Sequence, residues 1–248
     1  MYNRRTFLVT TLAVAAASSR RAAAATMADD TEDLEQLGKF ERVLGRPGIV
    51  IGVPHGTPDT GTFDSGRLVC DRLGLSGVFV TGFWDSKTRH RVNVNRDSEE
   101  IIGPASQVVR EWKSARAVAA NARYNAVVKE AAQGSLKVFY ELHSNHRPDL
   151  ETTVAVSTQG VWNSEAKRLR DAFAAAVDRL DSQIPRLTMR ISPLDKVTYP
   201  LYARASTVSR FSAKGCAIES PGRVLERGPW RTAYAQCLAE AIRAAAWS

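Results

Sequence analysis

Three reactive side chains in this sequence follow short apolar runs that are typical of buried strands. Each stands just after its run: His55 after 48–53, His143 after 136–142 and Glu219 after 215–218. In open α/β sheets, ligands bind beyond the carboxyl ends of the strands. Imidazole and carboxylate groups gathered at such an edge can bind a metal ion or transfer protons.

A carboxylate at the start of the next helix completes this set. A catalytic zinc site needs three ligands from His and Asp or Glu, with a fourth position open for water. His55, Asp64 and His143 supply such ligands, and Glu219 is left as a general base. Asp59 is an alternative ligand to Asp64. Each aspartate also has a structural explanation, Asp64 as a helix N-cap and Asp59 as a turn residue.

Strand-like and helix-like segments alternate along the rest of the chain. Strands are expected at 48–53, 77–81, 91–95, 136–142, 152–156, 187–191 and 215–218, and helices at 65–73, 105–132, 163–180 and 229–246. No internal repeat or linker separates them. The alternation predicts a single α/β domain, a sandwich with a largely parallel sheet.

Several of these residues stand in motifs that resemble the N-formylglutamate amidohydrolases, relatives of the zinc carboxypeptidases and aspartoacylases. The motifs are Val-Pro-His-Gly at 53–56, Asp64 opening a helix, Arg-His-Arg-Val-Asn-Val-Asn-Arg at 89–96 and Glu-Leu-His-Ser at 141–144. The resemblance covers about 49–219. It implies a three-layer sandwich in which helices flank a mostly parallel, mixed central sheet. The carboxypeptidase His-x-x-Glu spacing is absent, since position 58 is proline.

The resemblance also implies a role for each matching residue. It assigns one Zn²⁺ per chain to His55, Asp64 and His143, proton transfer to Glu219, oxyanion stabilisation to Arg91 or Arg89, and the substrate carboxylate to Asn95 and Arg96. No partner is assigned to the second ring nitrogen of His143, because Glu141 is expected on the opposite face of its strand.

These assignments predict a zinc-dependent amidohydrolase that cleaves an amide bond next to a carboxylate. The expected substrate is a small acidic acyl-amino acid, a cell-wall peptide or poly-glutamate. The alternative is a non-catalytic binding protein of the same fold, which would capture acidic ligands through its arginine cluster. A serine hydrolase is disfavoured because the chain has no Gly-x-Ser-x-Gly motif.

The first 25 residues are typical of an export signal. Arg4 and Arg5 precede Thr-Phe-Leu, a short apolar stretch and a run of alanines that ends at Ala25, which resembles a twin-arginine signal. An ordinary Sec signal or an N-terminal anchor is the alternative. The apolar stretch falls short of the ~20 residues that span a bilayer.

We therefore expect residues 1–25 to be a signal peptide cleaved near Ala25, residues 26–45 an N-terminal extension, and residues 46–248 a single zinc-hydrolase-like α/β domain. This organisation predicts a periplasmic or secreted protein that uses the twin-arginine export machinery. It also predicts no stable membrane span after processing.

Composition and charge narrow the remaining classes. The 248 residues are 44% hydrophobic and 24% charged, which excludes a disordered or collagen-like chain. Half of the net charge of +8 comes from four arginines in the signal segment, and the rest is spread along the chain. Nucleic acid is therefore not an expected partner. Three widely spaced cysteines in apolar surroundings predict core packing rather than a disulfide framework.

Overall fold

The computed structural model describes residues 34–104, 107–180, 182–197 and 208–245. The expected signal peptide at 1–25 and its cleavage site lie outside these residues. Within the described part of the chain, no helix is long and apolar enough to cross a membrane.

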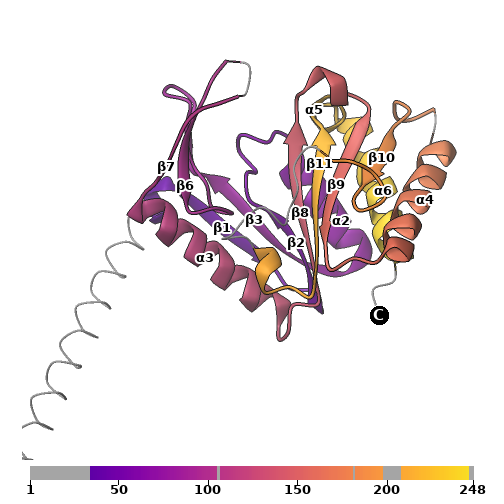
Figure 1. Cartoon of the computed structure of the whole chain (residues 1–248), viewed down its shortest axis with the longest axis horizontal. Helices are drawn as coiled ribbons and strands as arrows, with labels where there is room; N and C mark the ends of the chain where they lie inside the picture. Colours follow the sequence, from indigo (N-terminus) through magenta and orange to yellow (C-terminus); the bar gives the residue numbers. More distant parts are fainter. Residues whose placement is uncertain (1–33, 105–106, 181, 198–207, 246–248) are drawn as a thin grey trace, which may run out of the picture. The chain divides into compact units, whose positions relative to one another are not determined.

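A seven-stranded mixed sheet forms the centre of the domain (Figure 1). Its order is β1 (Gly38–Val43), β3 (Leu75–Gly82), β2 (Arg46–Val53), β8 (Val138–Asn145), β11 (Lys214–Pro221), β9 (Thr153–Gln159) and β10 (Thr188–Ile191). Neighbouring strands are parallel except for the pairs β1–β3 and β9–β11. The carboxyl ends of β2, β8 and β11 therefore meet at one edge.

Helices cover both faces of this sheet, which confirms the expected three-layer α/β sandwich. The helices α2 (Thr62–Leu73), α4 (Asn163–Arg179) and α6 (Gly228–Ala245) share one apolar core with residues of β2 and β8 such as Ile51 and Tyr140. The opposite face packs against α3 (Ala115–Ala132). There Gly52 lies so close to α3 that an added Cβ would be 2.4 Å from the hydroxyl of Tyr124.

The three cysteines lie in or beside this core. Cys70, Cys216 and Cys237 are all buried and free. The expectation of core packing is therefore confirmed.

Strand β1 lies within the range expected to be an N-terminal extension. It pairs antiparallel with β3 along its whole length, from Gly38 opposite Gly82 to Val43 opposite Gly77. The sheet of the domain therefore begins at Gly38, ahead of the boundary expected at residue 46.

A second, four-stranded antiparallel sheet is inserted between β3 and α3. Its strands are β4 (Trp84–Asp85), β5 (His90–Val92), β6 (Ser98–Ile102) and β7 (Val108–Lys113). Figure 1 shows it beside the edge at which the central strands end. Residues of this insertion line one wall of the cavity at that edge.

The expected helix at 105–132 is wrong over its first part. Residues 108–113 form β7, and the helix begins at Ala115. Ser114 is the N-cap, and its hydroxyl accepts a hydrogen bond from the Ala117 amide at 3.0 Å. The valines and the tryptophan of β7 favour a strand, and the capping serine sets the true start of the helix.

Three further short helices lie between or after the strands of the central sheet. They are the 3₁₀ helices η1 (Pro148–Leu150) and η3 (Val208–Arg210) and the α-helix α5 (Gly222–Glu226). Helix η1 follows β8, and α5 follows β11, so both lie near the edge at which His143 and Glu219 are found.

Candidate metal centre

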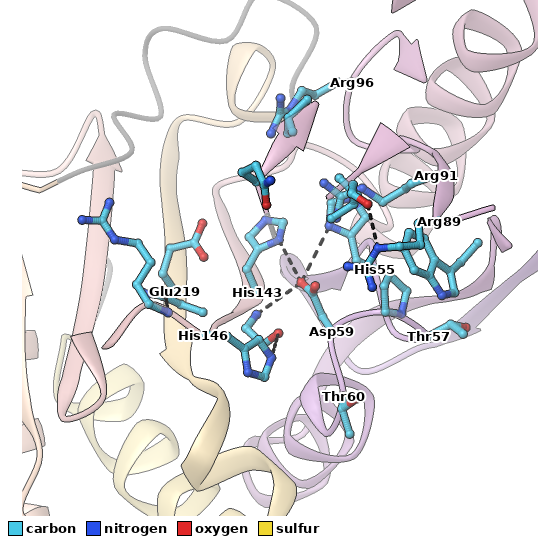
Figure 2. Close-up of a pocket in the computed structure, with 18 of the residues that line it drawn as sticks. His55, Thr57, Asp59, Thr60, Arg89, Arg91, Arg96, His143, His146 and Glu219 are labelled. Atoms are coloured by element: carbon cyan, nitrogen blue, oxygen red, sulfur yellow. Dashed lines mark hydrogen bonds and ion pairs between the residues drawn. The ribbon is translucent and has the colours of Figure 1, made fainter. Parts of the chain in front are cut away.

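Two histidines and an aspartate meet at the carboxyl edge of the central sheet (Figure 2). One ligand atom from each of His55, Asp59 and His143 lies within 4.8 Å of the others. The Nδ1 atoms of His55 and His143 lie 3.7 and 3.5 Å from Oδ2 of Asp59. All three side chains are buried.

Asp59, and not Asp64, lies with the two histidines. A turn after β2 brings its carboxylate back toward them, with the Asp59 amide donating to the His55 carbonyl at 2.8 Å. The Ser144 amide, just beyond His143, donates to Oδ2 of Asp59 at 3.2 Å. Asp59 is thus held through its main chain by His55 and through its carboxylate by Ser144.

The expectation that Asp64 is a ligand is therefore corrected. Asp64 lies in the first turn of α2, where its side chain is 55% exposed and forms an ion pair with Arg231 of α6 at 3.0 Å. It is not the N-cap either, since Gly61 occupies that position. The turn between β2 and α2 decides between the two aspartates, and sequence spacing alone does not define that turn.

Glu141 supports His143 from behind. Its Oε1 lies 2.8 Å from Nε2 of His143, and the Asn95 amide donates to the same oxygen at 2.8 Å. Glu141 was expected on the opposite face of β8, and that expectation is wrong. Residues two apart in a strand point to the same face, so the Glu-Leu-His order already indicates this pair.

The three groups of this candidate site have shifted pKa values. Burial, helped by the charge of Arg91, lowers the pKa of His55 to about 4. Burial also acts to lower the pKa of His143, but hydrogen bonds with Asp59 and Glu141 raise it to about 10. Burial acts to raise the pKa of Asp59, and hydrogen bonds with the two histidines outweigh it and hold that pKa well below its usual range. Asp59 is therefore ionised and His55 neutral, as metal ligands must be, whereas His143 is protonated near neutral pH, so that a metal bound at its Nδ1 would release a proton.

The donor set fits a zinc ion. Two imidazoles and one carboxylate are typical of catalytic zinc sites, in which a fourth position stays open. Glu141 occupies Nε2 of His143 and so leaves Nδ1 for a metal, the usual arrangement for a ligating histidine. Nε2 of His55 is buried and has no hydrogen-bond partner among the described residues. Such atoms are where ions or ordered waters are found.

Glu219 lies beside this group on the neighbouring strand. In the parallel pairing of β8 with β11 it is directly opposite His143. Figure 2 shows its carboxylate on the side of His143 away from Asp59. Glu219, His55, Asp59 and His143 all line one cavity of about 640 Å³.

Arginines of the inserted sheet form another wall of this cavity. Arg91 donates to Oε2 of Glu100 through Nε at 3.1 Å and Nη2 at 2.5 Å, and Arg96 lies 3.2 Å from Oε1. Glu100 is fully buried. Burial acts to raise its pKa, but the charges of Arg91 and Arg96 outweigh it, and the pKa is lowered.

Asn95 and Arg96 lie in different surroundings. Arg96 lines the cavity, whereas Asn95 is fully buried, is not among the lining residues and supports Glu141. Sequence reasoning thus missed the places of Asn95 and Glu100. The side chains of Asn93 and Asn95 are both buried, a pattern that the alternating Val-Asn-Val-Asn run does not indicate.

No protein-family model and no curated protein matches this sequence. Solved structures with a similar fold include a bacteriophage poly-gamma-glutamate hydrolase, at 14% identity and a TM-score of 0.51, over 84% of this chain and 88% of that chain. They also include a gene product from Agrobacterium tumefaciens, at 15% identity and a TM-score of 0.53, over 85% of this chain and 96% of that one. The chain therefore shares its α/β fold with these proteins over most of its length.

Proposed function

We propose that the protein is a zinc-dependent amidohydrolase that cleaves an amide bond next to a carboxylate, with one Zn²⁺ per chain. The observation that carries this proposal is the buried group of His55, Asp59 and His143 at a cavity that Glu219 also lines. The fold supports the same class of reaction, since one protein with a similar fold is a poly-gamma-glutamate hydrolase. The amide bonds of that polymer lie next to carboxylates.

Glu219 would carry the proton in this reaction. A zinc ion supplies, when bound, a Lewis acid for the scissile carbonyl and the attacking water. Glu219 would accept the proton of that water and return it to the leaving amine, a role typically worth ~10²–10⁴-fold in rate. Its place opposite His143 on β11 supports this role.

Arg91 would stabilise the charge that develops on the carbonyl oxygen. Its guanidinium is held by buried Glu100, and its charge already lowers the pKa of His55. A fixed charge aimed at a developing oxyanion contributes most in a site shielded from water. Arg96 also lines the cavity and would bind the substrate carboxylate, which aligns the scissile amide.

The deciding experiment measures the zinc content of the purified wild-type protein beside that of His143→Ala. We expect about one zinc per wild-type chain and loss of zinc in the variant. Glu219→Gln should keep its zinc and lose hydrolysis of acyl-amino acids. No zinc in the wild-type protein after zinc is supplied would overturn the proposal. Bound zinc with no hydrolysis would leave the binding-protein alternative.

The N-terminal sequence supports a second proposal, that the chain is exported by the twin-arginine route to the periplasm or the medium. Arg4 and Arg5, followed by Thr-Phe-Leu, carry it. The intact mass of the exported protein should correspond to a chain that begins near residue 26. A full-length mass would contradict cleavage.

A further inference from the structure

Arg89 differs from the other two cavity arginines in the way that it is held. Its Nε donates to the Ile102 carbonyl at 2.7 Å, and its Nη2 donates to the Gly103 carbonyl at 2.7 Å. Arg91 and Arg96 instead share the carboxylate of Glu100. Among the described residues, no carboxylate forms an ion pair with Arg89.

The two carbonyls fix one edge of the Arg89 guanidinium and leave the other free of these contacts. Nε and Nη2 share one edge of the planar group. A guanidinium has five N–H donors, so the edge formed by Nη1 and Nη2 keeps donors for a ligand. Such an edge can bind a carboxylate through two parallel hydrogen bonds.

The backbone at Arg89 is also held in a costly conformation. Its φ of 54° lies in the left-handed region, which non-glycine residues rarely adopt and which is common at functional sites. The Ile102 amide donates to the Arg89 carbonyl at 2.9 Å. Main chain and side chain of Arg89 are thus both tied to the end of β6.

The surroundings of Arg89 strengthen the attraction between its charge and an anion. It is half-buried and lines the cavity together with Trp84, Ile102 and Val108, which are apolar. A charge beside apolar groups is screened less than one in open water. Figure 2 shows Arg89 on the wall that faces His143 and Glu219 across the site.

From these observations we propose that Arg89 is an anion subsite that binds a second carboxylate of the substrate, separate from the group at Arg96. The inference rests on the proposed function and narrows its substrate class to amides that carry two acidic groups. The apolar neighbours of Arg89 would contact the short carbon chain between them.

The test measures binding of two ligands by isothermal titration calorimetry. Glutarate is a dicarboxylate without an amide bond, and valerate is the monocarboxylate with the same number of carbons. We expect the wild-type protein to prefer glutarate by about 10–100-fold, as a charge-assisted bidentate contact implies. The preference should hold in zinc-free protein as well, where glutarate cannot bind to the metal.

Two variants separate ligand binding from a structural role. Arg89→Gln should lose the preference for glutarate, and Arg89→Lys should regain part of it. Arg110→Gln is the matched control, because Arg110 is exposed on β7, stacks on Trp112 and does not line the cavity. It should keep the full preference. Thermal unfolding of each variant shows whether it is folded.

The same preference in Arg89→Gln as in the wild type, or its absence from the wild type, would overturn the inference. The zinc content of the same samples distinguishes failure of this inference from failure of the proposed function. One zinc per chain without a preference for glutarate would leave the hydrolase and remove the subsite. A preference for glutarate that depends on Arg89, in a protein that binds no zinc, would leave the subsite and remove the hydrolase.

Discussion

The two aspartates that could complete the metal site lie five positions apart and have different surroundings. Asp59 is buried between two histidines and accepts the Ser144 amide, whereas Asp64 is mostly exposed and paired with Arg231. A carboxylate is a metal ligand only where other donors converge on it. The structure therefore separates two residues that look equivalent in the sequence.

Asp59→Asn should weaken zinc binding by more than the roughly 10–100-fold that loss of a supporting contact costs, because it removes the charged ligand itself. Asp64→Asn is the matched control and should bind zinc as the wild type does. It should change stability by less than about 1 kcal/mol, as is usual for an exposed ion pair. Zinc affinity is measured by competition with a chromophoric chelator. Equal losses of zinc affinity in Asp59→Asn and Asp64→Asn would contradict the assignment of Asp59 as the ligand.

Glu141→Gln tests the contact behind His143. The variant keeps the shape of the side chain but loses the charge that holds Nε2 of His143, so zinc affinity should fall by about 10–100-fold. Glu151→Gln, at an exposed carboxylate outside the site, should leave zinc affinity unchanged. If Glu141→Gln binds zinc as tightly as the wild type, Glu141 does not support the ligand.

At the scale of elements, the carboxyl edge of the sheet could be predicted from the sequence. The apolar runs before His55, His143 and Glu219 all form strands of the central sheet, β2, β8 and β11, and these strands are neighbours. Buried strands have a strong local signal. The predicted edge therefore exists in the structure, with both histidines and Glu219 on it.

The inserted sheet could not be predicted in the same way. Its strands β4 to β7 are short, and β7 is mostly exposed. Such strands are defined by pairing with their neighbours and carry little apolar periodicity of their own. The sequence therefore indicated a single strand at 91–95 and a helix from 105, and it did not reveal the buried carboxylate Glu100 that orients Arg91.

Glu100→Gln tests how this sheet holds its arginines. The change removes the charge shared by Arg91 and Arg96, and we expect it to lower the free energy of unfolding by about 1–3 kcal/mol near neutral pH. Folding lowers the pKa of Glu100 below its ordinary value of 4.5, so its contribution is present above that pH and is lost as the pH falls further. Urea unfolding of the wild type and of Glu100→Gln measures this difference in the free energy of unfolding.

The stability difference between the wild type and Glu100→Gln should therefore be full at pH 7 and shrink below about pH 4.5. Glu111→Gln is the control, since Glu111 is nearly half exposed and lies 3.6 Å from Arg96. Glu111→Gln should change the free energy of unfolding by less than about 1 kcal/mol. A pH-independent difference for Glu100→Gln would mean that the charge of Glu100 is not what stabilises the sheet.

At the scale of the whole molecule, the candidate metal site connects segments that are distant in the sequence. His55 and Asp59 follow β2, while His143 lies near the end of β8, and α3 and the inserted sheet lie between them in the chain. A metal ion bound by all three would hold these parts together in the folded state only. Zinc binding should therefore raise the free energy of unfolding of the whole domain.

Zinc should accordingly raise the melting temperature of the wild-type protein. A ligand present at 100 times its dissociation constant stabilises the folded state by about 2.7 kcal/mol, which for a chain of this size corresponds to roughly 5–10 °C. Excess chelator should reverse the shift. Asp59→Asn should show almost none of it, and Asp64→Asn should show all of it. An equal shift in Asp59→Asn would mean that zinc binds to the folded chain at another place, because a ligand stabilises a protein only through the site that it occupies.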